Sequence, residues 1–239
     1  MFGRVPKNES MDTPLHTPSM YNIIENSRIK KKVGYKMKKK YAVNGGISFG
    51  SKLNARQLMV LAEYLDEDQE LELTTFQQLY IEVEEQQEET ALEAFRNVGL
   101  SVYPVGNYVK SLRTCNFCKG SEEEGMPVAK AINERIAGRP VPFTVRAAYT
   151  GCAVGCGEPL ANDIGVMKIK DTYNLYVGGK AKGIDAQLGT LVLEKAQPGK
   201  LYQAIDQVID LYAEQGKKRE PLAKFVHRYG MEELKELIQ

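Results

Sequence analysis

The sequence lacks the features that mark membrane-bound and secreted proteins. No apolar run approaches the roughly 18 residues that a transmembrane helix needs. The N-terminus also has no compact apolar segment of the kind found in a secretory signal. We therefore expect a cytoplasmic protein that does not contact a membrane.

The chain also has almost no net charge and few histidines and cysteines. Its 32 Lys and Arg oppose 31 Asp and Glu, so the field of the whole molecule attracts neither nucleic acid nor an anionic membrane. There are two histidines and four cysteines. Because the cytoplasm keeps thiols reduced, the four cysteines predict a metal or cluster site rather than disulfides.

A hydrophobic share of 43% in 239 residues is enough for a packed core. Residues 1–40 differ from the rest, since they mix Asn, Ser, Thr and Pro and then become basic. We interpret them as an N-terminal arm whose basic residues are solvated. A contact with nucleic acid or an acidic protein is the alternative for these residues, and it is not favoured.

Hydrophobic periodicity predicts a first domain over residues 41–107. Asn54 is positioned to cap a helix with Gln57 reaching back, and Leu58, Leu61 and Leu65 recur on one face of that helix. The predicted elements are a strand at 41–49, this helix, strands at 71–73 and 79–83, a helix at 88–98 and a strand at 102–105. The order β-α-β-β-α-β is that of a ferredoxin-like domain.

The remainder, residues 108–239, predicts a second domain of mixed type, so the fold class is α+β. Its Pro221 is expected to begin one of two closing helices, because proline is favoured in the first turn of a helix. The predicted elements are a helix at 126–137, strands at 143–149, 164–169, 173–177 and 190–193, and the two closing helices.

The four cysteines fall into two pairs in glycine-containing loops. Two residues separate Cys115 from Cys118, and three separate Cys152 from Cys156. Four thiolates at such spacings suit zinc or a cuboidal iron-sulfur cluster, and spacing alone does not choose between them. Zinc pairs commonly lie about 12–20 residues apart, so the wider gap here favours a cluster.

At this point the sequence resembles the siroheme-containing sulfite and nitrite reductases, especially their small members with a single repeat. The resemblance covers roughly residues 41–195 and depends on an ordered series of motifs. These are the Glu72–Gln78 stretch, Val109–Cys115 leading into the first cysteine pair, Thr150–Cys156 containing the second, and the glycine turn Tyr176–Lys180.

The resemblance implies a ferredoxin-like half domain followed by an α/β domain that binds a 4Fe-4S cluster and siroheme. The four cysteines would hold the cluster, and Cys156 would also bridge it to the siroheme iron. Sulfite or nitrite would be reduced with electrons from a ferredoxin-like donor. The residues expected to bind the cofactor are Lys110, Arg113, Gly178 and Gly179, and those expected to act on the anion are Arg146, Lys180 and Lys182.

Three departures from the family pattern keep other functions open. The first cysteine pair is normally separated by five residues rather than two, and Phe76 and Thr144 stand where the family has cations. A non-catalytic protein that transfers electrons or handles a tetrapyrrole is therefore one alternative. A structural zinc module whose basic arm contacts nucleic acid is another. Because larger relatives contain two such halves, either one half suffices here or a homodimer supplies the second.

Overall fold

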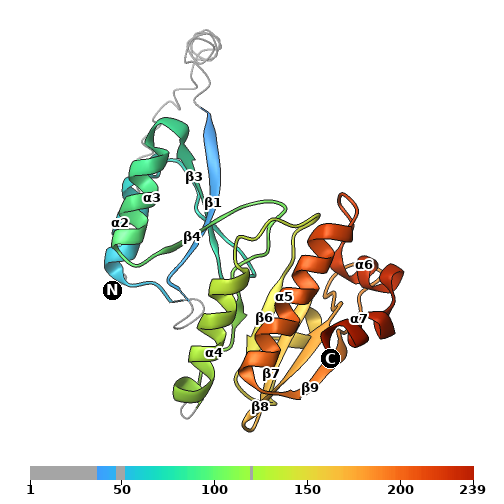
Figure 1. The fold of residues 1–239 in the computed structure, drawn as a ribbon. Helices are drawn as coiled ribbons and strands as arrows, with labels where there is room; N and C mark the ends of the chain where they lie inside the picture. The colour runs from blue at the N-terminus through green and yellow to red at the C-terminus, as the bar shows by residue number, and fades with distance from the viewer. Residues whose placement is uncertain (1–36, 47–51, 119–120) are drawn as a thin grey trace, which may run out of the picture. The chain divides into compact units, whose positions relative to one another are not determined.

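The computed structural model describes residues 37–46, 52–118 and 121–239, and the predicted arm at 1–36 lies outside them. From Lys38 onward the chain forms one compact unit. No helix in these ranges is both long and apolar enough to cross a bilayer. The unit contains two β-sheets, each with its own hydrophobic core (Figure 1).

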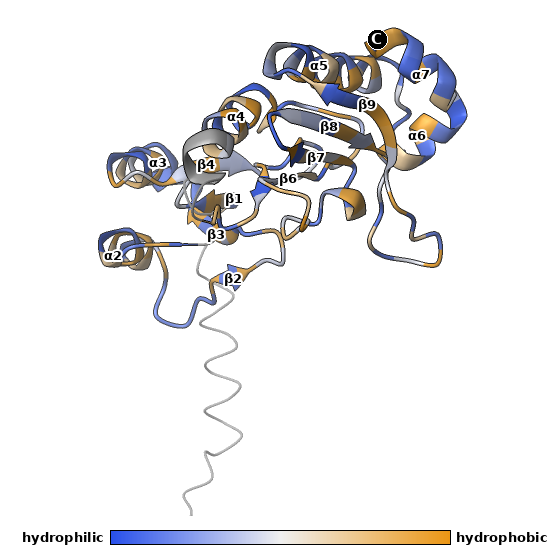
Figure 2. Ribbon diagram, turned by 90° about the horizontal axis from the view of Figure 1, so that it is seen from below, coloured by the Kyte–Doolittle hydropathy of each residue, from blue (hydrophilic) through white to orange (hydrophobic). Residues whose placement is uncertain are grey.

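The first sheet is antiparallel, with strand order β2-β3-β1-β4. Its helices α2 and α3 lie on one face of the sheet (Figures 1 and 2), where they bury a core that includes Leu61, Ile81 and Phe95. The elements in chain order are β1 (Lys38–Asn44), α2 (Ala55–Glu63), β2 (Glu72–Leu73), β3 (Leu79–Glu84), α3 (Glu88–Asn97) and β4 (Ser101–Pro104). The predicted ferredoxin-like order is therefore confirmed.

Two details of this half differ from the prediction. The first strand begins at Lys38, three residues before the expected position. On α2 the predicted cap is present, because Asn54 Oδ1 accepts the Gln57 N–H and Gln57 Oε1 accepts the Asn54 N–H. The prediction that Leu58 faces inward is wrong, since Leu58 is exposed and Gln57 takes a buried place.

The second sheet has the order β5-β6-β7-β8-β9, in which β5, β6 and β7 are parallel and the rest antiparallel. Helices α4 and α5 cover the same face of this sheet (Figures 1 and 2). The strands are β5 (Arg113–Thr114), β6 (Ala147–Thr150), β7 (Ile164–Ile169), β8 (Thr172–Val177) and β9 (Thr190–Ala196), and the helices are α4 (Ser121–Ile136), α5 (Pro198–Gln215), α6 (Leu222–Tyr229) and α7 (Met231–Ile238).

The predicted strand at 143–149 is only partly right. Strand β6 begins at Ala147, because its ladder with β7 pairs Ala147–Thr150 with Ile164–Met167. Before it, Val145 makes an isolated bridge with Val109. The residues between Pro142 and Ala147 therefore form an irregular segment, which carries Thr144 and Arg146.

Side-chain hydrogen bonds connect the two sheets. The Gln77 amide donates to the Thr114 carbonyl at 2.9 Å and accepts the Thr114 N–H at 3.1 Å. The buried Ser111 hydroxyl accepts hydrogen bonds from Asn44 and Gln78 at 3.0 and 2.7 Å. Residues of the first sheet therefore fix the backbone immediately before Cys115.

Candidate cluster and anion site

The two cysteine loops begin at the same edge of the second sheet. Strands β5 and β6 are parallel, with Thr114 paired to Tyr149, so both chains leave the sheet at their carboxyl ends. Cys115 follows β5 directly, and Cys152 lies two residues after the end of β6. The Cys115 N–H donates to the Tyr149 carbonyl at 3.2 Å, and the Gly151 N–H donates to Cys115 Sγ at 3.3 Å.

A glycine holds the second cysteine loop against the first. A Cβ on Gly157 would lie 2.0 Å from the Tyr149 carbonyl oxygen and 3.3 Å from the Cys115 nitrogen. No side chain fits in that space, because real Cβ atoms essentially never come closer than 3.0 Å to another heavy atom. Gly157 therefore allows the backbone next to Cys156 to contact the backbone of Cys115.

None of the four cysteines forms a disulfide, and their side chains differ in exposure. Cys115 is half-buried, whereas Cys118, Cys152 and Cys156 are exposed. In the parts of the chain that are described, no three His, Cys, Asp or Glu side chains are grouped closely enough to hold a metal ion. The fold brings Cys115 to the Gly151–Gly157 loop, and thiols with a backbone N–H donor to sulfur are the right chemistry for a cluster.

All five cations predicted from the sequence line one cavity of about 420 Å³ next to these loops. We call it the cation-lined cavity. Its wall includes the predicted Gly179 and also Phe76, from the segment between β2 and β3. The five cations are Lys110, Arg113, Arg146, Lys180 and Lys182.

These cations differ in how far their charge is already compensated. Arg113 pairs with Glu158 at 2.8 Å and Lys180 pairs with Asp185. Arg146 and Lys182 form no ion pair with any carboxylate that the structure describes, although the charges on Arg146 and Lys180 act on the nearby Asp163 carboxyl. The Nε atom of Arg113 is buried without a hydrogen-bond partner in the same described part. A cavity with cations that form no ion pair with a described carboxylate, and with an unpaired donor, suits a ligand with several anionic groups.

The glycine turn contributes its shape more than its N–H groups. A Cβ on Gly179 would lie 2.4 Å from the Leu160 carbonyl oxygen, so glycine is needed for this close approach. The N–H groups of Gly178 and Lys180 already donate to Asp163 and Gln187 at 2.8 Å. In this turn the cationic groups that line the cavity are the ammonium groups of Lys180 and Lys182.

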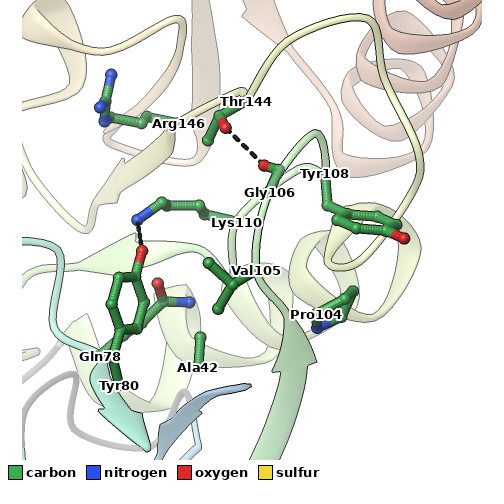
Figure 3. Close-up of a pocket in the computed structure, with 10 residues that line it drawn as sticks. All are labelled: Ala42, Gln78, Tyr80, Pro104, Val105, Gly106, Tyr108, Lys110, Thr144 and Arg146. Atoms are coloured by element: carbon green, nitrogen blue, oxygen red, sulfur yellow. Dashed lines mark hydrogen bonds between the residues drawn. The ribbon is translucent and has the colours of Figure 1, made fainter. Parts of the chain in front are cut away.

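The two positions where cations were expected have other contacts. Phe76 is buried in the cavity wall, with Lys110 Nζ 5.7 Å from its ring centroid. Thr144 donates from Oγ1 to the Gly106 carbonyl at 2.6 Å (Figure 3). Phe76 gives the cavity an aromatic surface, and Thr144 fixes the segment that carries Arg146.

Asp163 is a site residue that the sequence did not indicate. It lines the cavity, is 8% exposed, and accepts the Arg146 backbone N–H at 2.8 Å. Burial raises the pKa of its carboxyl to about 6, against the opposing effects of that hydrogen bond and of the charges on Arg146 and Lys180. No local motif marks this aspartate, because the loop after β6 is what brings it beneath Arg146.

Asp163 predicts a pH-dependent stability. Its folded pKa lies above the ordinary value of 3.8, so its contribution to the free energy of unfolding is fully present below about pH 4. The contribution is lost as pH rises through about 6, a loss on the order of 2–3 kcal/mol. Asp163→Asn should therefore stabilise the protein at pH 7.5 relative to wild type and much less at pH 4.5.

Urea unfolding at the two pH values measures this difference, with exposed Asp171→Asn as the matched control. An equal stability difference between wild type and Asp163→Asn at both pH values would show that the Asp163 carboxyl has no raised pKa.

Comparison with known proteins identifies the family of this chain. Residues 108–239, more than half of the chain, match the family model described as nitrite and sulphite reductase 4Fe-4S domain. The chain is 27% identical over 156 residues to an assimilatory-type sulfite reductase of Nitratidesulfovibrio vulgaris, covering 65% of this chain and 69% of that protein. It is also 26% identical over 187 residues to a cobalt-factor III methyltransferase of Priestia megaterium, covering 78% of this chain but 34% of that protein.

A solved structure shows the same fold. The crystal structure of dissimilatory sulfite reductase I superposes with a TM-score of 0.64 at 14% identity, over 83% of this chain and 68% of that chain. The solved structure shows the fold, and the family model, which matches more than half of the chain, shows the family. This chain belongs to the family of the nitrite and sulphite reductase 4Fe-4S domain.

Proposed function

We propose that this protein is an oxidoreductase that reduces sulfite or nitrite with a 4Fe-4S cluster and siroheme. The observation that carries the proposal is the gathering of five cations around one cavity that adjoins the cysteine loops. The ion pair between Arg113 and Glu158 connects these features, because each residue lies two positions from a predicted cluster ligand. When bound, the two groups would supply the electrons and the iron to which the anion binds.

The residues divide into those for the cluster and those for anionic groups. Cys115, Cys118, Cys152 and Cys156 would hold the cluster, with Cys156 as the thiolate shared with siroheme. Lys110, Arg113 and the turn at Gly178–Gly179 would hold the carboxylates of the tetrapyrrole. Arg146, Lys180 and Lys182 would orient the sulfite or nitrite and stabilise the charge that develops on it.

We also propose an electron donor and a cellular compartment for this protein. A ferredoxin-like protein would donate the electrons, and a reducing compartment such as the cytoplasm would keep the four cysteines out of disulfides. The division into domains at 41–107 and 108–239 stays a prediction, as does a homodimer that would supply a second half. The chain spans 34% of the length of the methyltransferase and 69% of the length of the sulfite reductase. The activity of either whole protein is therefore a proposal for this chain.

A second candidate function is a non-catalytic cluster protein that handles a modified tetrapyrrole. Phe76 and Thr144 favour it, because they replace cations that the reductase family has near the bound anion. The similarity to a methyltransferase named for cobalt-factor III, over 78% of this chain, also favours it. Such a protein would bind a tetrapyrrole in the cation-lined cavity and would not turn over sulfite or nitrite.

Arg146→Ala tests the proposed role of the cavity. Because Arg146 has no carboxylate partner among the described residues, its removal should weaken sulfite or nitrite binding about 10–100-fold, the effect of losing a hydrogen bond to a charged group. Optical titration with each anion measures the affinity. Arg96→Ala on α3, an exposed arginine away from the cavity, is the matched control. An affinity equal to that of wild type would contradict the role.

A further inference from the structure

An ion pair joins the two cysteine loops to each other. Arg113 lies two residues before Cys115, and Glu158 lies two residues after Cys156. Between them, Arg113 Nη1 is 2.8 Å from Glu158 Oε2. The pair therefore connects the start of the first cysteine loop to the end of the second.

Glu158 has a backbone conformation that is unfavourable for its residue type. Its φ of 56° and ψ of 48° are left-handed, a region that costs free energy for a residue with a Cβ. Two hydrogen bonds of 2.8 Å hold it there, because its N–H donates to the Gly155 carbonyl and its own carbonyl accepts from the buried Asn162 amide. A glutamate kept in this conformation beside a cysteine loop indicates a use for its side chain.

Arg113 is the more firmly placed partner of the pair. Its side chain is 22% exposed, against 55% for Glu158. The two hydrogen bonds between Gln77 and Thr114 fix the backbone of the next residue. The guanidinium keeps a further donor for a ligand in the cation-lined cavity, since its Nε has no partner among the described residues. Glu158 therefore holds Arg113 without using all of its donors.

We propose that Glu158 is a positioning residue for the metal site, which acts through Arg113 to hold the second cysteine loop against the first. Ligands on two separate loops lose conformational freedom when they bind one metal group, so a contact that joins the loops beforehand raises the affinity for that group. The pair is partly exposed and contributes little to the stability of the fold. The inference rests on the part of the proposed function that assigns the four cysteines to one site, and it requires neither siroheme nor turnover.

Optical titration of the iron-free full chain with Co²⁺ tests this role, because Co²⁺ binds cysteine thiolates and the complex absorbs visible light. Glu158→Gln and Arg113→Gln should each weaken Co²⁺ binding about threefold to fivefold, the effect of losing a partly exposed ion pair. The two changes together should weaken it no further, because both remove the same contact.

The direction of the effect of Arg113→Gln separates this role from a simple effect of charge. If Arg113 acted through its charge alone, removing a cation near the site would strengthen Co²⁺ binding. If Arg113→Gln does not fold, Glu158→Asp decides the question. It keeps the charge on an exposed side chain and shortens its reach towards Arg113, so it should weaken Co²⁺ binding about threefold.

Glu220→Gln is the matched control. It breaks the 2.8 Å ion pair of Glu220 with Arg228 on α6 and leaves the cysteine loops unchanged, so it should keep the wild-type Co²⁺ affinity. Stronger Co²⁺ binding by Arg113→Gln, a wild-type affinity in Glu158→Gln or Glu158→Asp, or no Co²⁺ binding by wild type would each overturn the proposal. A chain that binds Co²⁺ as predicted but acquires no siroheme would contradict the proposed function and support the role of Glu158.

Discussion

Gly157→Ala should lower the free energy of unfolding by ~3 kcal/mol and the melting temperature by about 6–12 °C. The added Cβ would lie 2.0 Å from the Tyr149 carbonyl oxygen, which already accepts the Cys115 N–H. Neither contact involves a flexible side chain, so the backbone must move. The movement separates the Cys156 loop from Cys115, and iron content should fall together with stability.

Gly199→Ala is the matched control for this substitution. Gly199 lies in the first turn of α5, and an added Cβ there meets no atom within 4 Å. Alanine is a better helix former than glycine, so this variant should be more stable by up to ~1 kcal/mol. Thermal unfolding and iron analysis of the two variants measure the effects. A Gly157→Ala protein with wild-type melting temperature and iron content would contradict the close approach of the two loops.

Cys156→Ser should remove the iron-sulfur absorption and any coupling to siroheme. Cys156 is the predicted shared ligand, and a serine hydroxyl is a poor replacement for a soft thiolate. Because the Cys156 side chain is exposed in this structure, the substitution should change stability little in protein without iron. The measurements are the optical spectrum and the iron and acid-labile sulfide per chain.

Val154→Ser, in the same loop, is the control for Cys156→Ser. Val154 is 79% exposed and lies between Cys152 and Cys156, so this change alters the loop and keeps all four thiols. It should retain the wild-type spectrum. An unchanged spectrum and iron content in Cys156→Ser would rule out Cys156 as a ligand.

The elements of the first sheet could be predicted because their signals are local. The Asn54 and Gln57 cap involves residues three positions apart, and it is present as expected. The inward face of α2 was harder to predict, because Gln57 is buried through a contact with the Val98 carbonyl at 3.3 Å, from a distant part of the chain. Leu58, the next residue on α2, is exposed.

The cations of the site could be found from the sequence, whereas the acidic residues that they contact could not. Arg113, Arg146 and Lys180 were expected near an anion, and they line one cavity. Two contacts depend on how the loop after β6 folds back. They are the ion pair of Arg113 with Glu158 and the hydrogen bond from the Arg146 backbone N–H to the Asp163 carboxyl.

The most direct test is an ultraviolet-visible spectrum of wild-type protein purified without oxygen, with iron, zinc and acid-labile sulfide measured on the same sample. The proposed function predicts siroheme bands over broad iron-sulfur absorption, with about four cluster irons per chain and a matching amount of sulfide. Iron and sulfide without a siroheme band would favour the non-catalytic cluster protein. Zinc in a colourless protein would contradict the cluster itself.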